Sequence, residues 1–213
     1  MRFRSTKASG SFDCTKHGAF ELLVHMEADP HCYSYAAFDF QAVLPFNIAR
    51  ELGNVAAYTL RHAAGRYVVC AQPPRADRSS AFRSSWTALD TRLARQKTWL
   101  LSATLKDLRS EPRWSAALQI ARAAQTHIEP SDHEHVVAHL STVGPARLRD
   151  CLKLCGSGSD SFDALLGLVS SGILFLDPPD DLSLDCELRL EPKACDITTI
   201  SWLPSPPADH LSI

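Results

Sequence analysis

Apolar residues along the first part of the chain recur with two spacings, one typical of helices and one typical of strands. Positions three and four residues apart indicate an amphipathic helix. Runs rich in aromatic and β-branched residues indicate strands. The predicted helices are 19–28, 79–95 and 112–126, and the predicted strands are 33–44 (one or two strands), 54–61, 66–71 and 99–104. Residues 1–17 are polar and basic and are predicted to form an extended arm.

A second pattern follows in residues 131–190. Ser131 with Glu134 has the spacing of a capping box at a helix start. Pro145 is expected at the first position of the next helix, and Gly172 is expected to end the third. The predicted elements are helices over 131–140, 145–154 and 161–170, then a hairpin of 173–176 and 182–190. Three short helices and a hairpin predict a winged helix, a variant of the helix-turn-helix.

The composition is typical of a globular protein with a sizeable core. The chain has 213 residues, of which 45% are hydrophobic and 22% are charged, and this length fits one large or two small domains. It has no apolar run near the roughly 20 residues that span a bilayer. No apolar stretch follows the basic N-terminus as in a signal peptide. Seven scattered cysteines without a CxxC pair predict neither a zinc site nor a disulfide framework. We therefore expect a cytoplasmic protein without membrane contact.

Charge is distributed unevenly between the two parts of the chain. Residues 1–127 contain 17 Lys and Arg against 10 Asp and Glu, whereas residues 128–213 contain 5 against 14. This asymmetry predicts that the first part contacts phosphate and that the second does not. The sequence has neither a GxGxxG nor a GxxxxGK[ST] motif, so no nucleotide cofactor is predicted.

Short segments across residues 5–190 resemble a known family. They are Gly10-Ser11-Phe12 with Lys16, Glu27-Ala28-Asp29-Pro30, Tyr33-Ser34-Tyr35, the helix that contains Trp86, and Ala164-Leu165-Leu166 with Gly172-Ile173-Leu174. In this order they are similar to the TnsA-type endonucleases, subunits of heteromeric transposases that cut at transposon ends. The resemblance implies an α/β fold with a restriction-endonuclease-like core and a following winged-helix domain. The implied parts are a nuclease-fold domain over 1–110, a helical linker and winged helix over 111–191, and a loosely structured tail over 192–213.

The catalytic residues of that family do not carry over. Such a core holds Mg²⁺ with carboxylates on neighbouring elements, while a nearby lysine helps to activate water. In this chain Ala19, Tyr58, Cys70 and Gln72 occupy the family positions. Glu21 lies two residues from the helix position, which is a rotation of about 200° on a helix. The resemblance therefore implies a nuclease-like protein with no metal, no cofactor and no catalytic residue.

The positive charge of the first part predicts contacts with the DNA backbone. The basic residues around the predicted hairpin and the helix after it are the candidates, although a solvated surface would show the same pattern. They are Lys7, Lys16, Arg61, Arg66, Arg75, Arg78 and Arg83.

The predicted winged helix has the opposite character. Residues 161–171, the expected recognition helix, contain no Lys or Arg, and Asp180 and Asp181 make the expected wing acidic. Such a surface repels a duplex, so it is predicted to dock a protein, either a transposase or a target-selection factor.

These observations favour a non-catalytic DNA-binding or scaffold subunit of a DNA transposition complex. Two alternatives stay open. One is an active metal-dependent endonuclease subunit whose acids are misaligned in this comparison, with Glu21, Asp29 and Asp39 as the carboxylates to test. The other is a winged-helix DNA-binding regulator unrelated to transposons.

Overall fold

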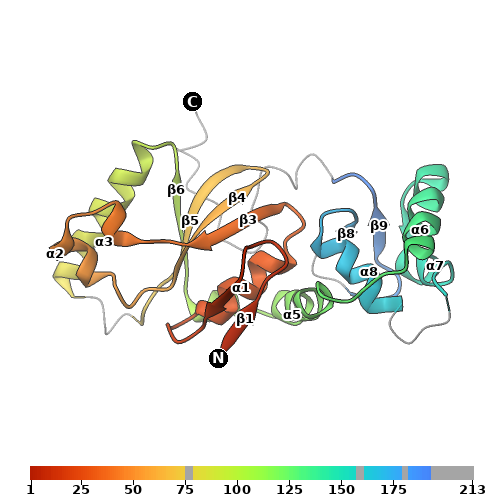
Figure 1. The fold of residues 1–213 in the computed structure, drawn as a ribbon, viewed down its shortest axis with the longest axis horizontal. Helices are drawn as coiled ribbons and strands as arrows, with labels where there is room; N and C mark the ends of the chain where they lie inside the picture. The colour runs from red at the N-terminus through yellow and green to blue at the C-terminus, as the bar shows by residue number, and fades with distance from the viewer. Residues whose placement is uncertain (75–78, 157–160, 179–181, 193–213) are drawn as a thin grey trace. The chain divides into compact units, whose positions relative to one another are not determined.

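The computed structural model describes residues 1–74, 79–156, 161–178 and 182–192 (Figure 1). Within these residues the chain forms eight α-helices and three β-sheets. The predicted α/β class is therefore confirmed.

The described chain divides into two compact units. Residues 1–23 and 33–109 form the first unit, and residues 24–32 and 110–192 belong to the second. The chain thus passes from the first unit to the second within one helix, α1, and returns at residue 33, at the start of the next strand. Each unit is described by itself below.

The first unit contains most of the strands. Its elements are β1 (Arg2–Arg4), β2 (Ser11–Asp13), the start of α1 (Ala19–Ala28), β3 (Cys32–Ala37), the 3-10 helix η1 (Phe40–Ala42), α2 (Phe46–Glu51), β4 (Ala57–His62), β5 (Gly65–Ala71), α3 (Ser80–Ala94), β6 (Trp99–Ala103) and α4 (Leu105–Leu108).

A four-stranded sheet in the order β3-β4-β5-β6 forms the centre of the first unit. Strands β4 and β5 are an antiparallel hairpin, and β5 and β6 run parallel. A parallel pair needs a long connection, and α3 supplies it. Ser79 caps this helix, because its Oγ accepts the N–H of Phe82 at 3.0 Å. The predicted hairpin, the strand near 99 and the helices over 19–28 and 79–95 are confirmed.

One face of this sheet is buried against α2 and α3. Side chains alternate between the two faces of a strand, so Val68 and Cys70 of β5 share a face with Ala57 of β4. These residues are part of a cluster that also contains Phe40, Leu44, Ala49, Leu52, Val55, Phe82, Leu89 and Leu93.

The N-terminal residues form a hairpin, and the predicted extended arm is wrong. Strands β1 and β2 pair antiparallel, with Phe3 opposite Phe12. The ring of Phe12 lies 5.4 Å from the ring of Tyr35 and 5.7 Å from the ring of Tyr58. The packing of these aromatic rings stabilises the pairing of β1 with β2. The polar composition of the segment gave no indication of this pairing.

The expectation of strand structure over 33–44 holds only for its first part. Strand β3 ends at Ala37, and Asp39 then caps η1 by accepting the N–H of Gln41 at 2.9 Å. An aspartate side chain that binds the backbone two residues later favours a turn over an extended strand.

The second unit contains the remaining helices and a small sheet. Its elements after α1 are α5 (Arg113–Ala123), α6 (Pro130–Val143), β7 (Ala146–Arg147), α7 (Leu148–Leu152), α8 (Ser161–Ser170), β8 (Phe175–Asp177) and β9 (Glu187–Arg189). The sheet has the order β7-β9-β8, and both pairs are antiparallel. The helices predicted over 112–126 and 161–170 and the hairpin after them are confirmed.

Two predicted helix starts in this unit are wrong. Helix α6 begins at Pro130 with Glu129 as its N-cap, so Ser131 lies inside the first turn. Proline is favoured at a first helical position because its missing N–H would have no helical partner there. Pro145 precedes the short strand β7 instead of opening a helix, because Ala146 and Arg147 pair with β9 before α7 begins at Leu148.

Helix α8 is covered along most of its length by other parts of the second unit. Ala164, Leu165, Leu166, Leu168, Val169 and Ser170 are all buried. A Cβ added at Gly167 would lie 3.0 Å from the carbonyl oxygen of Ala123, at the end of α5. Ser170 Oγ donates to the carbonyl of Glu27 at 2.8 Å. Both α5 and the end of α1 therefore pack on α8.

Two further features concern the length of the helices and the state of the cysteines. Across the described ranges, none of the helices combines the length and the apolar character needed to cross a bilayer. The cysteines in those ranges are free thiols, and all but Cys14 are buried.

Candidate functional site

The start of α1 lies against the end of β5, at the position where the resemblance implies a catalytic centre. Gly18 has a φ of +69°, and a Cβ added there would lie 2.5 Å from the Cβ of Ala71. Only glycine allows both the backbone angle and this close approach. The contact fixes Ala19, on α1, next to Ala71 and Gln72 at the end of β5.

The family positions on the hairpin are buried and do not form one site. Cys70 pairs with Ala57 and faces the cluster under α3, whereas Tyr58 pairs with Val69 and packs on Phe12. Directly opposed residues share a face of the sheet, so Tyr58 and Cys70 point to opposite faces. Burial raises the pKa of the Cys70 thiol and that of the Tyr58 hydroxyl. Both side chains therefore stay neutral at physiological pH and pack as core residues.

The strands of the central sheet contain no carboxylate at all. Strands β3, β4, β5 and β6 read CYSYAA, AYTLRH, GRYVVCA and WLLSA. A shift of the family alignment by one or two residues along any strand therefore places no Asp or Glu on the sheet. Since Mg²⁺ needs oxygen ligands, chiefly carboxylates, the sheet itself cannot supply a metal site of the family type.

Glu21, Asp29 and Asp39, the acids proposed for an active endonuclease, each bind a different partner. Glu21 Oε1 accepts from Arg109 Nε at 2.9 Å and also from Arg109 Nη2. The Glu21 side chain is only 7% exposed, so this cation replaces its lost hydration. Asp39 accepts from the backbone of Gln41, and Asp29 Oδ1 accepts the N–H of His31 at 2.8 Å. Across the described ranges, no three His, Cys, Asp or Glu side chains are grouped closely enough to hold a metal ion.

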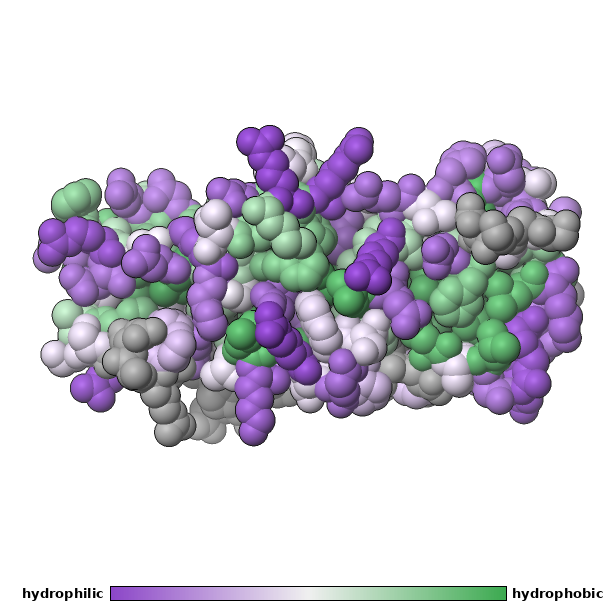
Figure 2. All heavy atoms as spheres, turned by 90° about the horizontal axis from the view of Figure 1, so that it is seen from below, coloured by the Kyte–Doolittle hydropathy of each residue, from purple (hydrophilic) through white to green (hydrophobic). Residues whose placement is uncertain are grey.

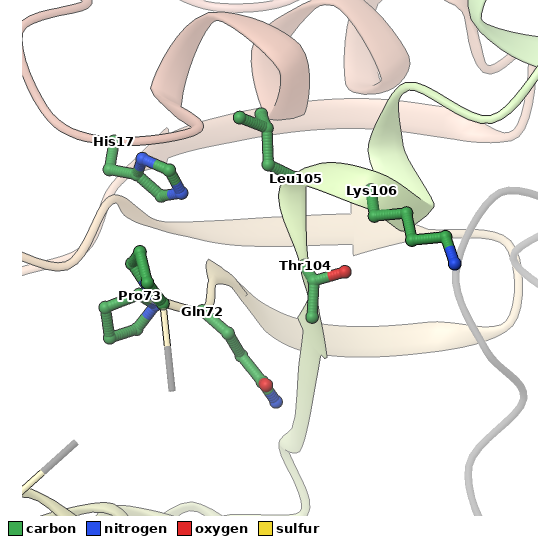
Figure 3. A pocket seen from close by; sticks show the side chains of 7 residues that line it. His17, Gln72, Pro73, Thr104, Leu105 and Lys106 are labelled. Carbon is green, nitrogen blue, oxygen red and sulfur yellow. The ribbon is translucent and has the colours of Figure 1, made fainter. Parts of the chain in front are cut away.

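A pocket of about 360 Å³ lies between the end of β5 and the start of α4 (Figure 3). Two of its polar side chains are engaged or directed away from its centre. Gln72 Nε2 donates to Ser102 Oγ. In Figure 3 the ammonium of Lys106 points away from His17. The lining residues are His17, Gln72, Pro73, Pro74, Thr104, Leu105 and Lys106.

Thr104 provides no reactive hydroxyl in this pocket. Its Oγ1 donates to Asp107 Oδ2 at 2.7 Å, and its backbone N–H donates to the same oxygen at 2.9 Å. These two hydrogen bonds lower the pKa of Asp107. Thr104 Oγ1 also accepts the backbone N–H of Asp107 at 3.3 Å, which completes the capping box of α4. The pocket occupies the place where the resemblance implies a catalytic centre, but none of its described lining residues is an acid.

The hairpin places two of the predicted DNA contacts side by side. Arg61 of β4 and Arg66 of β5 are directly opposite each other, and both are exposed. In the described ranges neither has a carboxylate partner. Like charges that face each other across strands destabilise a hairpin by a few tenths of a kcal/mol or more. A phosphate bound between the two guanidinium groups would offset that repulsion, since arginine binds phosphate oxygens in pairs.

The other predicted contacts are dispersed. Arg83 is exposed in the first turn of α3, with no acid paired to it in the described ranges. Lys16 is engaged, because its Nζ donates to the carbonyl of Val55 at 3.3 Å. Lys7 lies in a turn in which Ser5 Oγ accepts its backbone N–H at 2.9 Å. Arg75 and Arg78 lie outside the described residues.

In the second unit, every Lys and Arg described between 128 and 192 is paired with an acid. Arg147 and Arg149 both contact Asp185. Lys153 binds Asp150 at 2.7 Å, and Arg189 binds Asp177 and Glu187 at 2.8 Å each. This region therefore offers DNA phosphates no unpaired cation. Asp180 and Asp181, the predicted docking residues, lie outside the described residues.

Arg109 is the site residue that the sequence did not suggest. It is 88 residues from Glu21 in the chain, and no motif or spacing connects the two. Only the fold, which brings the end of α4 to the first turns of α1, could have identified the pair.

Comparisons with known proteins assign no family to the chain. No protein-family model, no curated protein and no solved structure matches it.

Proposed function

We propose that this chain is a non-catalytic, TnsA-like subunit of a DNA transposition complex, which binds duplex DNA through its first unit and a protein through its second. The single observation that supports the loss of catalysis best is the central sheet without carboxylates. The nearest helix acid, Glu21, is neutralised by Arg109.

The order of elements supports a restriction-endonuclease-like core in the first unit. A helix, a strand, a hairpin, a crossover helix and a parallel strand follow one another as α1, β3, β4–β5, α3 and β6. This order agrees with the helix, strand and hairpin that the resemblance implies.

The second unit has an order consistent with a winged helix. Helices α6, α7 and α8 precede the hairpin β8–β9, and β7 adds to the edge of that hairpin. In a DNA-binding winged helix, the last of these helices enters the major groove and contacts base edges. Here α8 is buried and has no basic residue, so we assign this unit to docking a protein, either a transposase or a target-selection factor.

Phosphate contacts account for the DNA binding that we propose. Arg61, Arg66 and Arg83 have no carboxylate partner in the described ranges, and all three are exposed. Such contacts bind any sequence and release counterions, so affinity falls as salt rises.

The test is duplex binding by the full chain over a range of salt. With a fluorescent 30-base-pair duplex, anisotropy at 50–300 mM KCl should give a log–log slope of about −2 to −4, equivalent to two to four phosphate contacts. Duplexes of unrelated sequence should bind within a few-fold of one another. No binding at 50 mM KCl, or an affinity that salt does not change, would refute the proposed DNA contact.

A further inference from the structure

The outer face of α3 and the segment that leads into α2 enclose a groove of about 640 Å³. The two helices are neighbours in the first unit, on the left of Figure 1.

The two walls of this groove differ in chemistry. The wall on the α2 side is apolar and consists of Val43, Leu44 and Pro45, which precede α2, and Ile48 within it. The α3 wall is polar except for Ala88, and it ends in two arginines. Where α2 and α3 lie, Figure 2 shows hydrophilic side chains next to apolar ones. Among the described residues, no acidic side chain lines the groove.

The residues of the α3 wall lie on one side of the helix. Ser84, Ala88, Thr91 and Arg95 are three or four residues apart, the spacing of a helix face. From Ser84 to Arg95 the wall is about 17 Å long, or three helical turns. This length fits a peptide of about three turns laid along α3.

The two threonine hydroxyls of this wall bind the backbone of α3, and the two arginines have no acidic partner in the part of the chain that the structure describes. Thr87 Oγ1 donates to the carbonyl of Arg83 at 3.1 Å, and Thr91 Oγ1 donates to the carbonyl of Thr87 at 2.9 Å. Arg92 and Arg95 are exposed, and within the described ranges no carboxylate pairs with either of them. The groove therefore has one positively charged end and an apolar wall.

We propose that this groove binds an amphipathic segment of a partner protein, with acidic residues at one end. Its apolar side chains, three and four residues apart, would pack on the wall formed by Val43, Pro45 and Ile48. Its carboxylates would bind Arg92 and Arg95. Amphipathic helices bind apolar grooves in this way, and arginine pairs recognise acidic groups. A nucleic-acid backbone fits less well, because the apolar wall offers nothing to phosphate.

The site is independent of the DNA contact at Arg61 and Arg66. The experiment is a selection from a displayed library of random 16-residue peptides, with the full chain as bait. Peptides recovered on the wild type are then measured against three variants. Arg92→Glu/Arg95→Glu reverses the charged end, Ala88→Trp fills the groove, and Arg113→Glu/Arg122→Glu makes the same charge change on α5.

We expect enriched peptides with apolar residues three and four apart and Asp or Glu near one end. Their affinity should fall at least tenfold for each of the two groove variants and stay within twofold for the control on α5. Circular dichroism of the variants establishes that each is folded. A selection that enriches no such sequence, or peptides that bind the groove variants as well as the wild type, would overturn the proposal. A tenfold loss of duplex binding in Arg92→Glu/Arg95→Glu, with peptide binding unchanged, would reassign the groove to nucleic acid.

Discussion

Gly18→Ala is expected to lower the free energy of unfolding by roughly 2–4 kcal/mol. The new Cβ would lie 2.5 Å from the Cβ of Ala71, which is held in the central strand β5. Overpacking of this kind costs about 1–3 kcal/mol, and the left-handed φ of +69° adds about 1 kcal/mol for a residue with a side chain. Urea unfolding of the full chain, followed by circular dichroism, measures the loss.

Gly10→Ala is the matched control. Gly10 has a φ of +105° in the same unit, but nothing lies within 4 Å of a Cβ added there. It should therefore show the cost of backbone strain without the clash. Equal losses for the two variants would mean that the contact between α1 and β5 does not fix the start of α1.

Reversing the charge of the hairpin pair, Arg61→Glu/Arg66→Glu, is expected to weaken duplex DNA binding roughly 10- to 100-fold at 50 mM KCl. Two phosphate contacts would be lost and two repulsive charges added. In the neutral variant Arg61→Gln/Arg66→Gln, the log–log salt slope should become shallower by about two. Anisotropy with the same 30-base-pair duplex measures both effects.

Stability separates this effect from damage to the fold. The neutral variant should unfold at the same or a higher urea concentration, because it removes the repulsion between two directly opposed cations. The control Arg113→Glu/Arg122→Glu changes the charge equally on exposed positions of α5. If both reversals weakened DNA binding equally, net charge alone would explain the affinity, and the hairpin would have no special role.

Local sequence patterns predicted most of the helices and strands of both units. The apolar spacing over 79–95 predicted α3 almost to the residue, and the structure adds that Ser79 is its N-cap. The N-terminal hairpin escaped prediction because its strands are three residues long and each has a single apolar residue, Phe3 or Phe12. Their pairing depends on packing against Tyr35 and Tyr58, which the local sequence does not show.

The candidate site depends on contacts between residues that are far apart in the chain. Sequence alone identified Cys70 and Gln72 as unsuited to a metal site. It could not show that Tyr58 faces away from Cys70, because that follows from the register of β4 and β5. The sequence also could not show that α8 is buried by other helices, since Ser170 binds the carbonyl of Glu27, which is 143 residues away in the chain.

The most direct test of the non-catalytic account is a cleavage assay under conditions in which the chain binds DNA. Full-length protein is incubated with supercoiled plasmid and linear duplex in 10 mM Mg²⁺ or Mn²⁺, concentrations on the order of those that saturate weak carboxylate sites. Complex formation is followed in the same samples. The account predicts bound DNA with no nicked or cut product above the level without protein. Metal-dependent cleavage that EDTA stops and that Glu21→Ala or Asp39→Ala abolishes would contradict it.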